Sequence, residues 1–425
     1  MIWVTLAGWL LATCSTQRYV PDAGEFLSDG DLRSAHLQRY WEAEIPLPAG
    51  DRVRSATLLD DSIYVVSRQG NVVAYHAGTG LGLWSYPLGD GLSEVLAPTH
   101  LIARQEPRPV AFVCGRRVVV LDRDSGELLT RVPIGFPAGA PAVGDDSVLY
   151  LGSSDGHLYA VRWHPPSRGI AGRLWRVRAR GPIRSRPAYD GFDLFFASEA
   201  GDVYSAVART RTERWSAHHF GQVFAALLLH DSGLYVASAD RSLYRLDPDS
   251  GEQRWRVRLP LPLEHDPIVA GKTVFQPGPR GGLYAIGVDS GEILWHRPEA
   301  ACFVARTADT VYVLAGGDGH LLALDAGSGD VRRTLAVHDA ATVVPNPYGD
   351  AIYLVSDANR IACLRPADVP YLTLRELAAV RERLRRQDDT TEIGEPLPGG
   401  AATEERSPAD DVLRSSTDVP PLSGR

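Results

Sequence analysis

The sequence predicts an all-β protein: an eight-bladed β-propeller of four-stranded blades, closed by an N-terminal strand and followed by a short C-terminal helix. Three observations predict this fold. A strand-like segment with an aromatic residue recurs eight times at a mean spacing of about 41 residues, a polar turn of the Asp-Ser-Gly type follows in most repeats, and a tryptophan follows that turn. A period of this length is typical of propeller blades, so the 425 residues are interpreted as one ring and its flanking segments.

The aromatic anchors mark one strand in each repeat. They stand at Tyr64, Phe112, Tyr150, Phe195, Tyr235, Phe275, Tyr312 and Tyr353. Apolar residues occupy successive positions around each anchor, as in residues 63–66 (IYVV). Because successive side chains of a strand point to opposite faces, an unbroken apolar run indicates a strand that is buried on both faces. The anchors therefore predict strands enclosed between neighbouring blades.

A hairpin turn and a tryptophan complete the repeat. The clearest pair is Asp249–Trp255 (DSGEQRW) and Asp289–Trp295 (DSGEILW). Asp and Ser side chains hydrogen-bond their own backbone in such turns, and glycine accepts the positive φ that a tight hairpin requires. The large, rigid indole suits packing between blades. Tryptophans at the repeating position are Trp84, Trp175, Trp215, Trp255 and Trp295.

The eighth repeat ends without its tryptophan strand. After residues 359–364 (NRIACL) the chain goes directly to Pro366. A matching strand stands at the other end of the chain, in residues 40–45 (YWEAEI), where Trp41 has no repeat before it. Pairing this strand with the eighth repeat would close the ring and remove an exposed sheet edge. The sequence therefore predicts a propeller of residues 38–366 that closes by strand exchange between the termini.

The repeat resembles the pyrroloquinoline-quinone-like repeat family. The resemblance rests on the succession of strand, turn, Leu-Tyr-Ala strand (residues 158–160 and 283–285), Asp-Ser-Gly turn and Trp, and it covers about residues 40–366. The second and eighth repeats lack the Trp, and the third carries an insertion around residues 163–173. The family includes quinoprotein alcohol dehydrogenases and the smaller BamB-type lipoproteins of outer-membrane β-barrel assembly. The resemblance is closest to the BamB type.

The resemblance does not extend to quinone chemistry. A quinoprotein dehydrogenase is expected to be longer, with calcium ligands, a catalytic aspartate and, in many members, an adjacent cysteine pair. No Cys-Cys pair occurs here, and the cysteines of the predicted propeller are Cys114, Cys302 and Cys363, each in an apolar strand. We expect them to be small buried hydrophobic residues. The sequence predicts no catalytic residues, no metal site and no cofactor.

The N-terminus predicts export. Residues 1–14 form an apolar run of signal-peptide length, too short to span a bilayer as a helix. The run ends in Leu-Ala-Thr-Cys, which resembles a bacterial lipobox whose Cys14 is lipidated, although Thr13 and the lack of a basic stretch before the run depart from that pattern. Plain secretion and a structural strand are the alternatives. By resemblance Ser15 favours the outer membrane, so we expect an exported, lipid-anchored protein facing the periplasm, with residues 15–37 as a flexible tether.

The C-terminal part predicts a helix and a tail. Apolar residues recur near helical spacing in residues 370–387, with Arg and Glu between them, which indicates a short amphipathic helix. In the simplest interpretation the helix docks on its own propeller; a membrane surface and a partner protein are the alternatives. Residues 388–425 hold nine acidic residues and three arginines, so we expect a disordered acidic tail. A net charge of −8 without a clustered basic face excludes a nucleic-acid footprint.

Charged residues in front of the innermost strands form the candidate binding site. These strands are expected to begin about eight residues before each anchor, so the residues preceding them should ring one mouth of the central channel. The residues concerned are Arg54, Arg184, Arg186, His265 and Asp266. Charged groups that converge on a funnel suit a polar ligand or a partner segment. The alternative is that they pair with each other and with water around a wide, wet channel.

Together these features favour a non-catalytic, exported scaffold for protein–protein interaction. The resemblance implies outer-membrane β-barrel assembly proteins as its partners and the membrane as a second partner through the lipid anchor; nucleic acid is not a partner. One alternative is a ligand-sensing or carbohydrate-binding propeller, which would need an aromatic platform on a loop face, for which Trp163 is the candidate. Another is a quinone-dependent oxidoreductase, which would need ligands that the sequence does not present.

Overall fold

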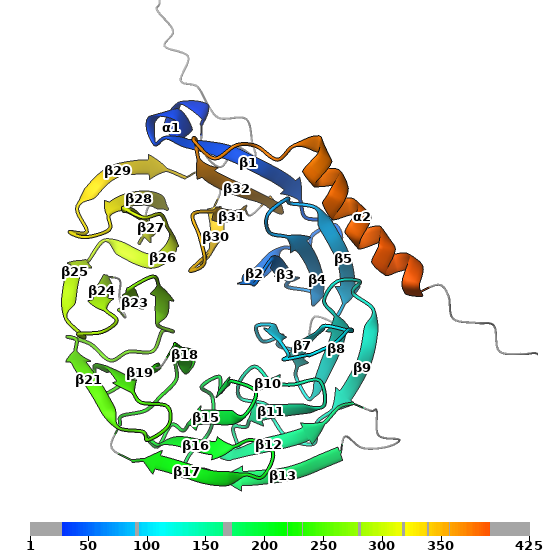
Figure 1. The fold of residues 1–425 in the computed structure, drawn as a ribbon, viewed down its shortest axis with the longest axis vertical. Helices are drawn as coiled ribbons and strands as arrows, with labels where there is room; N and C mark the ends of the chain where they lie inside the picture. The colour runs from blue at the N-terminus through cyan, green and yellow to red at the C-terminus, as the bar shows by residue number, and fades with distance from the viewer. Residues whose placement is uncertain are drawn as a thin grey trace, which may run out of the picture.

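The computed structural model describes residues 28–391, apart from gaps at residues 90–92, 165–171, 219, 232, 279–281, 317–318, 338–339 and 357. The predicted signal peptide with Cys14 and most of the predicted acidic tail therefore lie outside the described residues. Eight four-stranded antiparallel sheets follow one another along the described chain and form a ring of blades (Figure 1). The predicted eight-bladed β-propeller is confirmed.

The strands are numbered in chain order, and each blade is given from its innermost strand outward. Blades 1 to 4 comprise β2 (Val53–Leu59), β3 (Ser62–Ser67), β4 (Asn71–His76) and β5 (Gly82–Pro87); β6 (Thr99–His100), β7 (Pro109–Cys114), β8 (Arg117–Asp122) and β9 (Leu128–Pro133); β10 (Val143–Gly144), β11 (Val148–Gly152), β12 (His157–Arg162) and β13 (Gly172–Arg178); and β14 (Ala188–Tyr189), β15 (Asp193–Ala197), β16 (Val203–Val207) and β17 (Thr212–Ala217).

Blades 5 to 8 continue in the same order, except that the outermost strand of blade 8 comes from the N-terminus. They comprise β18 (Leu228–His230), β19 (Gly233–Ser238), β20 (Ser242–Leu246) and β21 (Gln253–Arg258); β22 (Ile268–Ala270), β23 (Thr273–Pro277), β24 (Leu283–Gly287) and β25 (Ile293–Arg297); β26 (Ala300–Arg306), β27 (Thr310–Ala315), β28 (His320–Asp325) and β29 (Val331–Ala336); and β30 (Ala340–Val344), β31 (Ile352–Ser356), β32 (Arg360–Pro366) and β1 (Leu37–Glu44).

The core lies between the blades. The second strands, such as β3 and β19, are buried at every position except in blade 7, where the ends of β27 are half-buried, because each face of a blade is covered by a neighbouring blade. Outer strands alternate instead: in β21 the Trp255 side chain is buried while Arg254 and Arg256 are exposed. The anchor Tyr64 is fully buried, as the apolar runs predicted.

Strand β1 closes the ring. It pairs antiparallel with β32, from Leu37 opposite Pro366 to Glu44 opposite Arg360, with a bulge before Trp41. Figure 1 shows β1, at the blue end of the chain, lying beside the brown-orange β32. The predicted strand exchange is confirmed, and it leaves no unpaired edge on β32.

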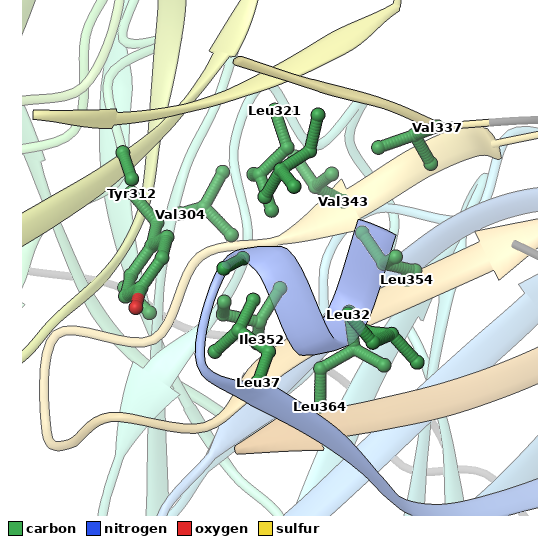
Figure 2. Close-up of a cluster of buried hydrophobic side chains, with 14 of the residues drawn as sticks. Leu32, Leu37, Val304, Tyr312, Leu321, Val337, Val343, Ile352, Leu354 and Leu364 are labelled. Atoms are coloured by element: carbon green, nitrogen blue, oxygen red, sulfur yellow. The ribbon is translucent and has the colours of Figure 1, made fainter. Parts of the chain in front are cut away.

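A short helix, α1 (Asp29–Ser34), precedes β1. Ser28 caps it by accepting a hydrogen bond from the Asp31 backbone N–H, and Leu32 is only 4% exposed. Figure 2 shows Leu32 pointing into a cluster of buried side chains with Leu354 and Leu364. The expected flexible tether is therefore wrong for residues 28–37. A helix of six residues is too short to show a helical period in sequence, and its order comes from one cap and one buried leucine.

A second helix, α2 (Leu374–Thr391), follows the propeller. It begins four residues later than expected because Thr373 caps it: Thr373 Oγ1 accepts from the Glu376 N–H at 3.2 Å, and Glu376 accepts from the Thr373 N–H at 2.7 Å. Leu374 is 86% exposed, so the start of the helix is not docked on the propeller. Among the described residues, neither helix is both long and apolar enough to cross a membrane.

Candidate functional site

The structure places four of the five predicted rim residues on blades 4 and 6, with blade 5 between them. Arg184 and Arg186 precede β14 of blade 4, and His265 and Asp266 precede β22 of blade 6. Blade 5 connects the two pairs: the Leu227 N–H donates to the Arg186 carbonyl at 3.1 Å, and the Ala226 N–H donates to the Asp266 carboxylate at 2.7 Å. This group is called the inner rim cluster below.

Members of the inner rim cluster differ in their contacts within the protein and in the exposure of their side chains. Arg184 lies 3.1 Å from Glu199, and its side chain is 55% exposed. His265 is exposed, and its backbone carbonyl accepts a hydrogen bond from Gln276 at 3.0 Å. The carboxylate of Asp266 in blade 6 accepts the hydrogen bond from Ala226 in blade 5, so it stabilises the contact between these two blades. Arg184 and His265 therefore have the side chains most available to a partner, and Arg186 is half-buried.

Arg186 acts electrostatically on a residue from the opposite side of the ring. Partial burial raises the pKa of Tyr348. The positive charge of Arg186 has a smaller effect and lowers this pKa. Arg186 belongs to blade 4 and Tyr348 to the β30–β31 loop of blade 8, so their electrostatic contact spans the central axis. Tyr348 is 72% exposed. It is an aromatic residue of this surface that the sequence reasoning missed, because it follows an innermost strand and does not precede one.

Arg54 stands apart from the cluster. It lies in β2 of blade 1 and pairs with Glu94 at 3.0 Å, with both side chains largely exposed. Exposed ion pairs of this kind contribute little to stability. The structure therefore places Arg54 on the ring but does not bring it together with the four other predicted residues.

Tryptophan locks join most of the blades. At five junctions the indole N–H donates to a backbone carbonyl of the next blade, at 2.8–3.1 Å. The indole also stacks on a glycine of that blade's outer turn, where φ is positive and an added Cβ would come within 2.5–2.8 Å of the ring. The locks are Trp41 on Gly80, Trp84 on Gly126, Trp215 on Gly251, Trp255 on Gly291 and Trp295 on Gly329.

Three junctions depart from this pattern, and the first is between blades 2 and 3. Thr130 of β9 has the register position that Trp84 has in blade 1. Trp163 of blade 3 fills the space, donates its N–H to the Asp145 carbonyl at 2.9 Å and is only 4% exposed. The expectation that Trp163 forms an exposed aromatic platform is therefore wrong, because the missing lock of blade 2 leaves a hole that this indole occupies.

The second departure is between blades 7 and 8. Arg333 of β29 stands where Trp295 stands in blade 6, so blade 7 lacks its tryptophan, which was not predicted from the sequence, whereas blade 8 receives Trp41 from β1. Leu32 of α1 packs against Leu335 and Val337 at this place. A cavity of about 640 Å³ with mixed charges, including Asp309, remains beside it.

The third departure is between blades 3 and 4. Trp175 is present, but the turn of blade 4 carries Arg211, at φ 56°, in place of a glycine. Trp175 is half-buried, and a cavity of about 360 Å³ lies against it. Sequence reasoning counted this tryptophan with the others, and the signal that distinguishes it is the residue in the following turn.

The described residues contain no cluster of metal-ligating side chains. Among residues 28–391 outside the gaps, no group of three or more His, Cys, Asp or Glu side chains could hold a metal ion. Cys114 and Cys363 are buried and unpaired, and burial raises the pKa of the Cys114 thiol to about 11. Such thiols are not nucleophiles at neutral pH.

Comparisons with known proteins agree with this architecture. The sequence model of the family described as "Outer membrane protein assembly factor BamB" matches residues 168–369. The BamB of Burkholderia pseudomallei (strain K96243) is 24% identical over 166 residues, 37% of this chain and 41% of that protein. The BamB of Yersinia pestis is 23% identical over 194 residues, 41% of this chain and 49% of that protein. The matches thus span less than half of each relative.

Solved structures show the same fold. BamB from Moraxella catarrhalis superposes with a TM-score of 0.60 at 15% identity, covering 77% of this chain and 99% of that one. The computationally designed protein Ika8 gives a TM-score of 0.59 at 13% identity, with the same coverage.

The fold defines the class of this protein: it is an eight-bladed β-propeller, and its repeats are similar to the pyrroloquinoline-quinone-like repeat over residues 168–369. Within that class its similarity is to the BamB type of outer-membrane assembly factor. The resemblance predicted from sequence is confirmed.

Proposed function

We propose that this protein is an exported, non-catalytic scaffold that binds protein partners in outer-membrane β-barrel assembly. The match of residues 168–369 to the BamB family carries this proposal. That range contains Arg184, Arg186, His265 and Asp266, which form the inner rim cluster, and it excludes Arg54, which stands apart.

The inner rim cluster supplies the chemistry for partner binding. Two arginines just before one inner strand present planar, multivalent donors for carboxylates, and the exposed Tyr348 offers an amphipathic ring on the opposite blade. The surface suits an acidic segment of a partner protein. Asp266 has a positioning role, because its hydrogen bond to Ala226 holds blades 5 and 6 in place.

An affinity purification tests the partner. The full-length protein, with its own N-terminus, is expressed in a Gram-negative host and purified from membranes in mild detergent, and co-purifying proteins are quantified by mass spectrometry. We expect recovery of β-barrel assembly proteins, with a loss of at least about tenfold in the R184Q/R186Q double variant. R54Q is the matched control, because it removes an exposed arginine of the ring outside the cluster, and it should recover the same partners. Failure to recover these proteins with the wild-type chain, or equal recovery with the double variant, would reject the proposal.

The same proposal includes a lipid anchor on Cys14. Two acyl chains or more hold a protein stably on a bilayer, whereas one chain gives only marginal binding. Incorporation of a labelled fatty acid, followed by membrane flotation, tests the anchor. C14S should lose both the label and membrane association while C302S keeps them, and label retained in C14S would contradict the anchor.

A further inference from the structure

The turn of blade 4 has the backbone of a lock turn but different side chains. In blade 5 the turn runs Asp247 to Glu252, and the Gly251 N–H donates to the Asp247 carbonyl at 2.8 Å. In blade 4 the Arg211 N–H donates to the Val207 carbonyl at the same distance. Arg211 therefore occupies the glycine position, with φ 56° against 74° for Gly251.

The Cβ of Arg211 prevents the lock at this junction. An added Cβ on Gly251 would lie 2.6 Å from the Trp215 ring, and arginine carries that atom. Trp175 still packs on its own blade, with its ring centre 5.8 Å from that of Tyr150, as Trp255 does at 5.9 Å from Tyr235. The indole keeps its place while the next blade does not close over it, and the cavity of about 360 Å³ lies between them.

The walls of this cavity are apolar and its rim is basic. Leu174, which is 41% exposed, and Trp175 form the apolar part. Arg162, His164 and Arg209 also line it, and no carboxylate does. The Asp145 carboxylate lies just outside, 3.4 Å from the guanidinium of Arg209, whose side chain is 68% exposed. Arg209 stands where blade 5 has Asp249 in the aligned turn. This turn has thus changed from acidic to basic.

A buried hydroxyl adds a polar contact inside the cavity. Tyr150 lines it and is fully buried. Its hydroxyl makes no hydrogen bond of good geometry among the described residues, and the nearby Tyr189 side chain interacts with it only enough to lower its pKa against the larger effect of burial. Burial raises the pKa of Tyr150 to about 12, so the phenol keeps its proton at neutral pH and can donate. An unpaired buried hydroxyl is costly, and a bound acceptor would satisfy it.

We propose that the cavity between blades 3 and 4 binds an anionic ligand with a flat apolar body, of the aromatic carboxylate class. Trp175 and Leu174 contact the flat body, Arg162 and Arg209 pair with the carboxylate, and Tyr150 donates a hydrogen bond. The volume is within the range of small-molecule sites. This site lies apart from the inner rim cluster and does not rest on the scaffold function.

Ligand-observed NMR with 2-naphthoate as the probe tests the site. We expect saturable binding of 2-naphthoate to the wild-type protein, and binding at least about tenfold weaker for the uncharged 2-naphthamide, because a charge-assisted pair is lost. R209Q should weaken 2-naphthoate binding by a similar factor. R332Q is the matched control, because it removes an exposed arginine from another junction cavity, and it should leave binding unchanged.

The variant R211G tests directly whether the side chain of Arg211 keeps the cavity open. Glycine restores the lock position, so Trp175 should dock on blade 4, close the cavity and abolish 2-naphthoate binding without loss of the folded state, which circular dichroism verifies. The proposal is overturned if the wild-type chain shows no saturable binding, if 2-naphthamide binds as well as 2-naphthoate, or if folded R211G or R209Q binds like the wild type.

Discussion

The junction between blades 5 and 6 and the junction between blades 3 and 4 use the same repeat with different outcomes. Trp255 is 8% exposed and donates its N–H to the Val288 carbonyl at 2.8 Å, whereas Trp175 is half-buried beside a cavity. The two indoles lie at nearly the same distance from the anchor tyrosine of their own blade, 5.9 Å and 5.8 Å, with interplanar angles of 60° and 35°. The difference lies in the next blade, where Gly291 lacks the Cβ that Arg211 carries. A single atom in a turn therefore decides whether a tryptophan stabilises a seam or lines a pocket.

The three departing junctions show that the ring tolerates the loss of a lock in different ways. Trp163 fills the hole between blades 2 and 3 from the opposite blade, and Leu32 of α1 packs between blades 7 and 8. Only the junction between blades 3 and 4 keeps its tryptophan and loses the glycine. Because the ring is closed, blades 3 and 4 are each still held at their other junction, which Trp163 fills on one side and Trp215 locks on the other.

The largest expected effect comes from breaking a complete lock. W255A removes a buried indole, its hydrogen bond and its stacking on Gly291, and it should lower the free energy of unfolding by about 4 kcal/mol. W175A should cost about 2 kcal/mol or less, because that indole is half-buried and its seam is already open. Urea unfolding followed by circular dichroism measures both. Equal losses in the two variants would contradict the distinction between locked and open junctions.

A smaller effect is expected at the seam that α1 covers. L32A truncates the leucine that packs between blades 7 and 8 and should cost about 3 kcal/mol. The melting temperature measures this loss, and L374A is the control because that leucine is 86% exposed. If L32A melts like the wild type, α1 is not the substitute for the missing tryptophan of blade 7.

The smallest effect concerns the ion pair that spans the open seam. Arg180 follows β13 of blade 3, and its Nε lies 3.0 Å from both carboxylate oxygens of Asp202 in blade 4. Burial opposes ionisation, but hydrogen bonds from Arg180, His218 and Ser198 lower the pKa of Asp202 to about 2. D202N should cost about 2 kcal/mol at neutral pH.

The pH dependence of this pair has a defined sign. The carboxyl of Asp202 has a pKa near 3.8 when unfolded and about 2 when folded, so its contribution is complete above about pH 4 and is lost as the pH falls toward 2. The difference in melting temperature between wild type and D202N should shrink over that window. D330N, at an exposed pair with Arg297, is the control and should change little; a constant wild-type difference from pH 6 to 2.5 would contradict this role for Asp202.

Much of the fold could be predicted because the repeat is local. The aromatic anchors, the Asp-Ser-Gly turns and the orphan strand of Trp41 each occupy a few adjacent residues, and all eight blades and the ring closure followed from them. The inner rim cluster was predicted in part, since strand starts could be counted back from the anchors. Its internal hydrogen bonds, such as the one from Ala226 to Asp266, join residues 40 positions apart and leave no local signal.

The sequence by itself determined the number of blades, the strand that closes the ring and the positions of the tryptophans. These features could be predicted because the pattern of a strand and the residues of a turn are adjacent in the chain. The tertiary structure alone decided which tryptophans act as locks, that Trp163 is buried, that α1 is ordered and that a cavity opens beside Trp175. Each of these outcomes depends on the fit of one blade's side chain against the next blade's turn. Close packing depends on distances of a few tenths of an ångström between residues that are far apart in the chain. A repeat pattern in the sequence therefore does not predict it.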